Sequence, residues 1–330
     1  MKRQGYLIQK IAEHDNLQLA YYKAKKGKAD RKEVIEYGKH LGENLSRLRQ
    51  HIVSGRVEIG NYHYFTVYDP KKRKICAAPF EQRILHHALM NVCHPFFETA
   101  QIYHNYASRV GKGTYAALEQ AKKYQQRYQW FLKLDFKKYF DSLDHEVLKI
   151  QLKRLFKDSR LLDIFNSIID SYDTGHKRGV PIGNLTSQYF ANHYLAGADH
   201  YIKEVLRIPA YIRYMDDLVL WHHKKDNLLV AGRRFREYTE MNLKLTLKPD
   251  CFNRNLHGLP FLGYLIYPNK VRLKHRSRIR FINKIKNFES NLKTEFWSQQ
   301  DFQNHVLPLI AFTEFANSKA FRKKVIFTIR

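Results

Sequence analysis

Two adjacent aspartates, Asp216 and Asp217, lie inside the apolar and aromatic run RYMDDLVLW at residues 213–221. Two like charges in such a run cost stability unless positive groups compensate them. A third aspartate, Asp135, ends the apolar stretch WFLKLDF at 130–136. Clustered carboxylates favour hard cations, and Mg²⁺ prefers oxygen ligands, including substrate phosphates. Because two Mg²⁺ ions about 3.5–4 Å apart stabilise both the attacking and the leaving oxygen of an in-line phosphoryl transfer, the three acids predict a nucleotidyl-transfer site.

Simpler roles are open to the same aspartates. Adjacent acids are common in hairpin turns, and Arg213 or nearby lysines could pair with them. The flanking apolar residues predict a hairpin with the two aspartates at its tip, because neither carboxylate could lie in mid-sheet without a partner.

The elements around the aspartates indicate the fold class. The strand at 130–136 precedes a helix for which Asp144 is the N-cap candidate. A second helix is expected from about Gln188 to Leu206, and the hairpin follows it. This order indicates an α+β fold whose sheet is covered on one face by helices. The pattern also predicts a polar basic loop at 23–32, a helix over 33–52, two strands within 62–78 joined by the turn DPKKRK, a helix over 81–98, and an amphipathic helix marked by Phe281, Ile285, Phe288, Leu292 and Phe296.

The charge balance indicates the class of partner. The 330 residues include 58 Lys and Arg against 31 Asp and Glu, a formal net charge of +27. Such an excess repels itself unless the partner is a polyanion, so we expect nucleic acid. Between 270 and 286 the basic residues stand without any acid, which is typical of a helix along a duplex backbone but also of a solvated helix face. The expected backbone contacts are Arg272, Lys274, Arg276, Arg278 and Arg280.

No membrane partner is expected. No apolar run approaches the length of a spanning helix, and the basic start of the chain lacks the apolar segment of a secretory signal. Cys76, Cys93 and Cys251 are scattered without the spacing of a metal site. These features are typical of a protein of the reducing cytoplasm.

The YMDD sequence between apolar strand residues resembles the catalytic motif of reverse transcriptases, and LKLDFKKYFDSLDHEVL resembles the preceding motif of their palm domain. The resemblance implies that Asp135, Asp216 and Asp217 are catalytic and bind two Mg²⁺, with Mn²⁺ as a substitute. It implies that the carbonyl of Phe136 also contacts a metal. It further implies that Phe140 packs against the sugar of the incoming nucleotide, where a large ring excludes a 2′-hydroxyl and favours dNTPs. Ordinary core packing is the other role open to Phe140.

Two further segments resemble parts of the same enzymes. FLGYLI resembles the hairpin that grips the primer end, which implies this role for Phe261, Leu262, Gly263 and Tyr264. DPKKRKICAAPFEQRILHHAL resembles the strands of the fingers, which implies triphosphate or template contacts by Arg73, Lys74 and Arg83. Arginine suits such contacts because its planar fork matches phosphate oxygens.

The loop GVPIGNLTSQYFAN narrows the resemblance. Most bacterial relatives carry Gln-Gly and then Ser-Pro here, whereas this chain has Ile182-Gly183 and later Ser187-Gln188. This pattern resembles the reverse transcriptases of diversity-generating retroelements, and it implies that Ile182, Gly183 and Gln188 line the site of the incoming nucleotide. Isoleucine can only pack where glutamine could hydrogen-bond, so discrimination should fall. Error-prone copying at template adenines is associated with this loop in that family.

The resemblance covers roughly residues 15–320 and implies a right-hand polymerase with an antiparallel palm sheet backed by helices. The implied regions are an N-terminal extension (1–60), fingers (61–125), a palm with part of the fingers inserted (126–268) and a thumb (269–330). The implied activity is that of an RNA-directed DNA polymerase that copies a template-repeat RNA into cDNA with adenine-directed errors. Its implied partners are the template RNA, the primer or cDNA strand, dNTPs and an accessory variability protein.

Some alternatives stay open. A reverse transcriptase of another bacterial lineage, such as a retron, group II-like or phage-defence enzyme, would carry the same aspartates. A catalytically inactive palm that only scaffolds RNA would not need them. The general acid is unassigned, because Cys251 stands where many relatives place a lysine and Lys248 is a weak substitute.

Overall fold

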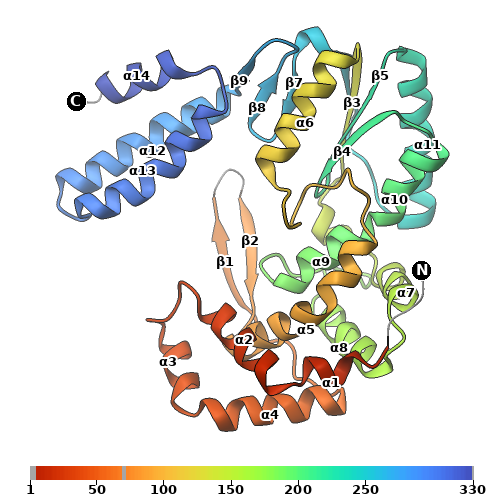
Figure 1. The fold of residues 1–330 in the computed structure, drawn as a ribbon, viewed down its shortest axis with the longest axis vertical. Coiled ribbons are helices and arrows are strands. Elements are labelled where there is room, and N and C mark those ends of the chain that lie inside the picture. Colours follow the sequence, from red (N-terminus) through yellow and green to blue (C-terminus); the bar gives the residue numbers. More distant parts are fainter. Residues whose placement is uncertain (1–4, 69–71, 329–330) are drawn as a thin grey trace.

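The computed structural model describes residues 5–68 and 72–328 (Figure 1). A helical N-terminal part, a central four-stranded sheet, a small three-stranded sheet and a group of C-terminal helices make up the molecule. Within those ranges no helix is long and apolar enough to cross a membrane.

The N-terminal part consists of helices and one hairpin. Its elements are α1 (Leu7–Ile11), α2 (His14–Lys25), α3 (Lys32–Lys39), α4 (Leu41–Ser54), β1 (His63–Val67), β2 (Arg73–Ala77) and α5 (Phe80–Thr99). The prediction of one helix over 33–52 is wrong, because the chain breaks at His40, whose φ of −119° and ψ of 40° are not helical. Gly38 and Gly42 flank the break, and glycine weakens a helix interior. The polar loop predicted from residue 23 begins later, because α2 continues to Lys25.

The β1–β2 hairpin and α5 are as predicted. The two strands pair antiparallel, with Thr66 opposite Lys74, and α5 includes the whole predicted helix over 81–98. Within the predicted DPKKRK turn, residues 69–71 lie outside the described residues, and β2 already begins at Arg73. Every residue of β1 is exposed, whereas Cys76 of β2 is buried, so the hairpin is uncovered along β1 (Figure 1).

The central sheet is antiparallel at each pairing and has the strand order β4-β5-β3-β6. Its strands are β3 (Trp130–Asp135), β4 (Ala210–Tyr214), β5 (Asp217–His222) and β6 (Cys251–Arg254), and the small sheet contains β7 (Leu259–Phe261), β8 (Tyr264–Ile266) and β9 (Val271–Leu273). β4 and β5 form the predicted hairpin, and Met215 and Asp216 are its turn. The helices of this part are α6 (Thr114–Arg127), η1 (Tyr139–Ser142), α7 (His145–Leu155), α8 (Ser159–Asp170), α9 (Leu185–Tyr194), α10 (Ala196–His200), η2 (Tyr201–Val205) and α11 (Lys225–Leu243).

Both faces of the central sheet are buried. Leu132, Leu134 and Leu218 pack into one core, to which α9 and α11 contribute. Phe131 and Trp221 pack into a second core with α6 and the small sheet. The prediction that helices cover only one face is therefore wrong, because both alternating sets of strand side chains are largely apolar.

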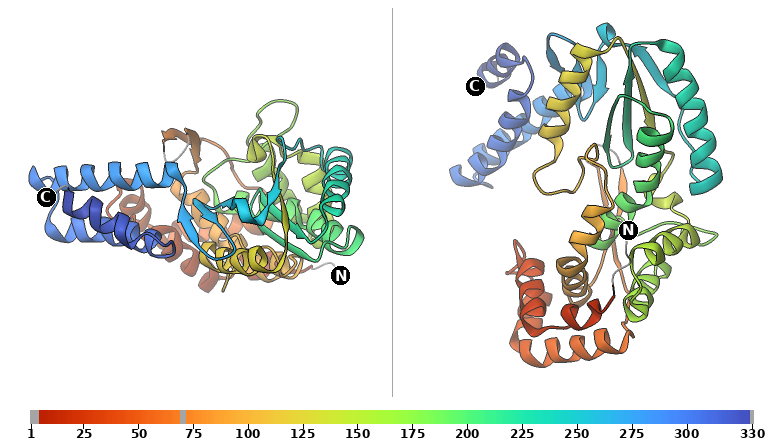
Figure 2. Two further views of the ribbon diagram at one scale, coloured as in Figure 1. Left: turned by 90° about the horizontal axis from the view of Figure 1, so that it is seen from above. Right: turned by 45° about the vertical axis from the view of Figure 1, so that its right-hand side comes forward.

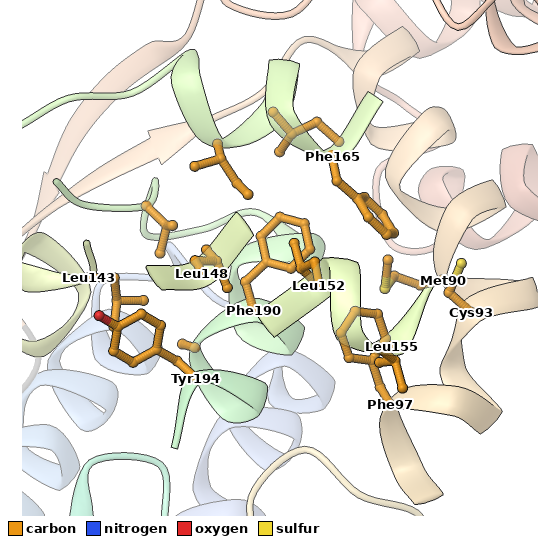
Figure 3. Packing of buried hydrophobic residues seen from close by; sticks show 14 of the residues in the cluster. Met90, Cys93, Phe97, Leu143, Leu148, Leu152, Leu155, Phe165, Phe190 and Tyr194 are labelled. Carbon is orange, nitrogen blue, oxygen red and sulfur yellow. The ribbon is translucent and has the colours of Figure 1, made fainter. Parts of the chain in front are cut away.

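The first of these cores extends into the N-terminal part. Figure 3 shows Phe97 of α5, Leu152 of α7, Phe165 of α8 and Phe190 of α9 in this cluster. The ring centroids of Phe165 and Phe190 are 5.3 Å apart, edge to face. Helix α7 begins at the predicted cap, where the Asp144 side chain accepts the backbone N–H at N3 at 3.1 Å.

The helix predicted from about Gln188 to Leu206 is divided. Helix α9 starts earlier, after Asn184, and ends at Tyr194; α10 follows, and η2 is a wider π-helical turn. The π turn begins two residues after Asp199, whose carboxylate is fully buried in an ion pair with β4. Such turns often accompany functional positions.

The C-terminal helices form a unit with a core of its own. They are α12 (His275–Lys293), α13 (Gln299–Glu314) and α14 (Lys319–Thr328). Phe281, Ile285, Val306 and Val325 form this small core, and Figure 2 shows the unit at one side of the molecule. The predicted amphipathic helix is confirmed as α12, although it ends before Phe296.

We predict that Asp158→Ala lowers the free energy of unfolding by about 1–3 kcal/mol. The Asp158 carboxylate accepts the N–H groups of Leu7 and Ile8 at 3.0 and 3.1 Å and caps α8 at Leu161 (3.4 Å), so the variant loses the α8 cap and the anchor of α1. Urea denaturation measures the change. Asp163→Ala, at an exposed position of the same helix, is the control; equal stability losses in both variants would contradict the anchoring role.

Candidate active site

The three predicted acids meet at one end of the central sheet. Asp135 at the end of β3 lies opposite Asp217 at the start of β5. The N–H of Lys248 donates to the Asp135 carbonyl at 2.8 Å, so the main chain of Asp135 points away from β5. Asp135 and Asp217 are therefore a non-hydrogen-bonded pair, with Cα atoms about 4.5 Å apart and side chains on one face. Asp216 stands beside them in the turn.

The main chain of Phe136 points the other way. Phe136 forms an antiparallel bridge with Leu247. Its two hydrogen bonds are made by the flanking residues, from the Lys137 N–H to the Thr246 carbonyl and from the Lys248 N–H to the Asp135 carbonyl. The N–H and carbonyl of Phe136 therefore face away from Leu247, on the β5 side. This direction aims the Phe136 carbonyl toward the end of the sheet where Asp216 and Asp217 lie.

Two lysines compensate the acids. The Nζ of Lys133 lies 2.6 Å from Asp217 Oδ1, and the Nζ of Lys248 lies 2.6 Å from Asp135 Oδ2. The Lys133 contact is an ion pair without hydrogen-bond geometry, so Asp217 Oδ1 is buried without a directed donor. Lys133 also donates to the carbonyl of Pro260 at 3.0 Å, which ties β3 to the small sheet.

Burial and repulsion perturb the acids. Burial, followed by repulsion from the nearby carboxylates of Asp135 and Asp217, raises the pKa of Asp216 to about 6. Burial also raises the pKa of Asp217, although the Lys133 ammonium opposes this change. Perturbed acids in a cavity are typical of functional sites, and a bound cation would favour the ionised forms.

A cavity of about 790 Å³ opens over this end of the sheet. It brings together these predicted residues: Arg73, Phe136, Phe140, Ile182, Gly183, Gln188, Asp216, Asp217 and Leu262. Its lining also includes Lys72, Ser108, Lys138, Tyr139, Asp141, Tyr214, Met215 and Lys248. Its size and its polar and aromatic lining suit a ligand of nucleotide dimensions.

Backbone contacts fix the loop that carries Ile182. The N–H of residue 180 donates to the Phe140 carbonyl at 3.0 Å, and the N–H of Cys76 in β2 donates to the Ile182 carbonyl at 2.7 Å. Gly183 has a φ of 123°, and a Cβ there would lie 2.9 Å from a β2 side chain. Glycine therefore lets the loop and β2 approach this closely, and Ile182 is held between Phe140 and β2.

The hairpin predicted to grip the primer is formed by β7 and β8. Its turn consists of Leu262 and Gly263, with φ values of 44° and 92°, which match the twist of a two-residue hairpin. The Gly263 carbonyl accepts the Lys274 N–H at 3.1 Å and the Ser277 hydroxyl at 2.8 Å. These bonds fix the turn to the start of α12.

A groove of about 740 Å³ runs from this turn along α12. Leu262 lines both the groove and the cavity, so the two adjoin. Lys274, Arg276 and Arg280 line the groove, as the sequence predicts for backbone contacts. The groove is therefore basic along one wall and adjoins the acids at one end.

Other predicted residues lie outside the cavity and the groove. The ammonium of Lys74 lies 4.2 Å from the ring centroid of Tyr64, and Arg83 pairs with Glu33 on α3. Neither basic residue lines the cavity. Arg272 and Arg278 instead lie over aromatic rings, and buried core positions hold Phe261 and Tyr264.

Sequence reasoning missed several residues that hold the site. Lys133 lies two positions before Asp135, and strand alternation could have placed both on one face. The alternative that Arg213 or nearby lysines pair with the aspartates is confirmed for lysines, because Lys133 and Lys248 hold Asp217 and Asp135. It is wrong for Arg213, whose guanidinium pairs with Asp199. No spacing in the sequence identifies Asp199 as the partner of Arg213, since Asp199 lies in α10 and Arg213 lies in the hairpin.

Comparison with known proteins places this geometry in a family. Residues 68–266 match the family model for reverse transcriptase (RNA-dependent DNA polymerase). The chain belongs to the reverse transcriptase family. Domains of this family generally use divalent metal ions.

The relatives of this chain include two proteins whose names refer to introns. It is 22% identical over 173 residues to the putative COX1/OXI3 intron 1 protein of Saccharomyces cerevisiae, covering 50% of this chain and 21% of that protein. It is 24% identical over 143 residues to nuclear intron maturase 2, mitochondrial, of Arabidopsis thaliana, a match that covers 38% of this chain and 20% of that protein. Protein YkfC of Escherichia coli is 24% identical over 307 residues, covering 78% and 80%. The chain thus spans about a fifth of the two intron-related proteins and most of YkfC.

A solved structure shares the fold. The telomerase of Candida albicans, in complex with the TWJ fragment of telomeric RNA, superposes with a TM-score of 0.52 at 12% sequence identity. The match covers 84% of this chain and 60% of that one. At this identity the likeness extends to the fold alone.

The oxygen donors of the reverse transcriptase site fit hard divalent ions. Carboxylates and a carbonyl are the ligands that Mg²⁺ and Mn²⁺ prefer, and Asp217 Oδ1 is buried without a directed donor. Among residues 5–68 and 72–328, no three His, Cys, Asp or Glu side chains are grouped tightly enough to form a complete metal site as they stand. Lys133 and Lys248 hold two of the carboxylates, so metal binding would displace these ammonium groups.

We predict that Asp216→Asn stabilises the protein in chelator, and only toward neutral pH. A raised folded-state pKa of about 6 gives stability that is present below the ordinary carboxyl pKa and is lost as pH rises through the folded value. The asparagine amide cannot ionise. Above about pH 6, the free energy of unfolding of the variant should therefore exceed that of the parent by about 2–3 kcal/mol, and near pH 4 the two should differ little.

Urea denaturation across this pH range measures the difference. Asp163→Asn, on the exposed face of α8, should show no such pH dependence. A constant difference between Asp216→Asn and the parent would mean that the Asp216 pKa is not raised.

Proposed function

We propose that this protein is an RNA-directed DNA polymerase. The observation that carries the proposal is the meeting of Asp135, Asp216 and Asp217 on one face of an antiparallel sheet, beside a cavity of nucleotide size, within a reverse transcriptase domain. The bound divalent ions, with Mg²⁺ as the proposed species and Mn²⁺ as a substitute, supply activation of the primer 3′-hydroxyl and charge neutralisation at the dNTP α-phosphate and the leaving pyrophosphate.

The residues of the chain provide the setting for that chemistry. Asp135, Asp216, Asp217 and the Phe136 carbonyl would hold the ions, because the mutual repulsion of the acids makes the site favour cations. Arg73 at the start of β2 and the preceding Lys72 line the cavity and would supply positive charge for the triphosphate. As a candidate proton donor to pyrophosphate, Lys248 lines the cavity.

Phe140 selects the sugar in this proposal. The side chain lines the cavity, and its carbonyl accepts a backbone bond from the loop that carries Ile182. The short helix η1 fixes the backbone beneath the ring. A ring held in this way excludes a 2′-hydroxyl by volume and favours dNTPs.

The regions of the chain take the roles of a right hand. We assign 1–60 to an N-terminal extension, 61–125 to fingers, 126–268 to a palm with part of the fingers inserted, and 269–330 to a thumb. The groove along α12 supports this assignment, because its basic wall adjoins the acids and suits a template–primer backbone. Leu262 and Gly263 in the adjoining turn would hold the primer end.

We further propose that the enzyme belongs to a diversity-generating retroelement. The backbone of the loop that carries Ile182 is fixed at the cavity by bonds to Phe140 and β2. The apolar side chain of Ile182 can discriminate between matched and mismatched base pairs by packing alone. The enzyme would then copy a template-repeat RNA into cDNA with adenine-directed errors, in the cytoplasm and together with an accessory variability protein. The relatives with intron-related names favour a second candidate, a group II-like enzyme of ordinary fidelity.

We predict that Asp216→Ala lowers dNTP incorporation on a primed RNA template with Mg²⁺ by about 10³-fold or more, because loss of a metal ligand removes several kcal/mol of transition-state stabilisation. Binding of the RNA should stay near the parental level, because the lost group is an anion. Primer extension and filter binding measure the two quantities, and Asp163→Ala is the control.

Parental synthesis by Asp216→Ala would refute the catalytic assignment. No synthesis by the parent, even with its candidate accessory protein and RNA supplied, would favour an RNA-binding scaffold.

We predict that Ile182→Gln lowers misincorporation at template adenines several-fold, on the order of 1 kcal/mol of discrimination, by restoring a polar check on the base pair. Sequencing of the cDNA measures the error spectrum. Ile35→Gln, an identical change at an exposed position of α3, should leave the spectrum unchanged. Faithful copying by the parent would instead favour the group II-like candidate.

A further inference from the structure

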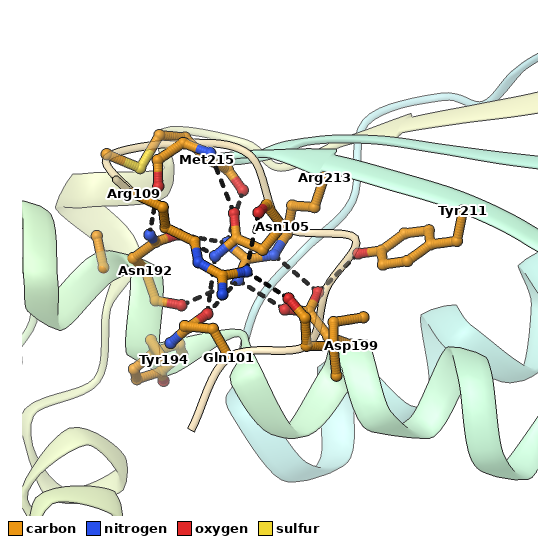
Figure 4. Close-up of polar contacts among 12 residues, drawn as sticks. Gln101, Asn105, Arg109, Asn192, Tyr194, Asp199, Tyr211, Arg213 and Met215 are labelled. Carbon is orange, nitrogen blue, oxygen red and sulfur yellow. Dashed lines mark hydrogen bonds and ion pairs between the residues drawn. The ribbon is translucent and has the colours of Figure 1, made fainter. Parts of the chain in front are cut away.

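A buried cation stands directly behind the turn that carries Asp216. Arg213 in β4 is fully buried, and so is its ion-pair partner Asp199 in α10. The pair is bidentate, with 2.7 Å from Nε to Oδ1 and 2.7 Å from Nη2 to Oδ2. Figure 4 shows the guanidinium at the centre of a polar cluster between the sheet and its helices.

The guanidinium joins four segments of the chain. Besides Asp199, it donates to Asn192 Oδ1 in α9 at 2.8 Å and to Gln101 Oε1, in the segment after α5, at 3.1 Å. It also donates from Nη1 to the carbonyl of Met215 at 3.2 Å. The fork therefore reaches from the helices behind the sheet to the turn itself.

The backbone of the same residue is fixed as well. The Arg213 N–H donates to the His104 carbonyl, and the Tyr106 N–H donates to the Arg213 carbonyl, each at 2.9 Å. Ser108, two residues after Tyr106, lines the cavity. One residue thus holds both the turn and the segment that forms a neighbouring part of the cavity wall.

The turn needs such a holder. Met215 has a φ of 55°, a left-handed conformation at the first turn position, where two-residue hairpins favour glycine or asparagine. A non-glycine residue keeps this geometry only where its surroundings impose it. The hydrogen bond from Arg213 to the Met215 carbonyl is one such restraint, and Asp216 is the next residue.

We propose that Arg213 is a positioning residue for catalysis, which holds the Met215 carbonyl against the Asp199-anchored cluster and thereby sets the place of Asp216 relative to Asp135. The proposal rests on the proposed polymerase function. A lysine ammonium could pair with Asp199, but it lacks the planar fork that reaches Asp199, Asn192 and Met215 together.

The experiment compares Arg213→Lys with the parent in primer extension, after circular dichroism has shown that the variant is folded. The expected result is a kcat lower by about 100-fold, as for a small displacement of a reacting group, with KM for dNTP near the parental value. The Mg²⁺ concentration for half-maximal rate should rise. Asp158→Ala is the control, because it weakens the fold at a distant helix and should keep kcat.

Parental kcat in folded Arg213→Lys would overturn the proposal. Equal kcat losses in Arg213→Lys and Asp158→Ala would also overturn it, because the effect would then follow stability alone. If Arg213→Lys does not fold, Arg213→Met with Asp199→Leu takes its place, since replacing both partners of a buried pair often preserves folding. The same losses are expected of that variant.

Binding of Mn²⁺, followed by electron paramagnetic resonance, separates this inference from the polymerase function. If the parent binds Mn²⁺ but synthesises no DNA, the polymerase proposal fails, and weaker Mn²⁺ binding by the Arg213 variant still supports the positioning role. If a folded Arg213 variant binds Mn²⁺ as the parent does and keeps the parental kcat, the positioning role is overturned and the polymerase function is not.

Discussion

Repulsion among three carboxylates at one end of a buried sheet is the constraint on which the rest of the structure depends. Asp135 and Asp217 are cross-strand neighbours, and Asp216 is adjacent in the turn. Burial alone would favour protonation of Asp216 and Asp217. Two lysines lower the electrostatic cost of the ionised acids. Lys133 of β3 pairs with Asp217, and Lys248, in the segment before β6, pairs with Asp135.

The cavity over the acids is assembled from segments that lie far apart in the sequence. Strand β2, the short helix η1, the loop at Ile182 and the turn at Leu262 each provide part of its lining. Main-chain hydrogen bonds link η1 and β2 to the loop, so the position of Ile182 depends on backbone geometry. In the proposed polymerase, selection at this point would rest on shape.

The C-terminal helices have a separate small core but are tied to the site at one place. The carbonyl of Gly263 accepts two bonds from the start of α12, and the basic groove begins at the same turn. These two bonds fix the start of α12 to the turn of the small sheet.

The sequence by itself determined the acids, the hairpin that presents them and most helices, because local periodicity and turn chemistry carry that information. It also identified the cavity residues of the loop at Ile182, through a motif. It could not identify the partners of Lys133 or Arg213, nor the second buried face of the sheet. Those features are contacts between elements distant in the chain, such as Arg213 with Asp199 and Gln101. Only the tertiary structure decides them, since burial of a charge is affordable only where the fold brings its counter-charge alongside.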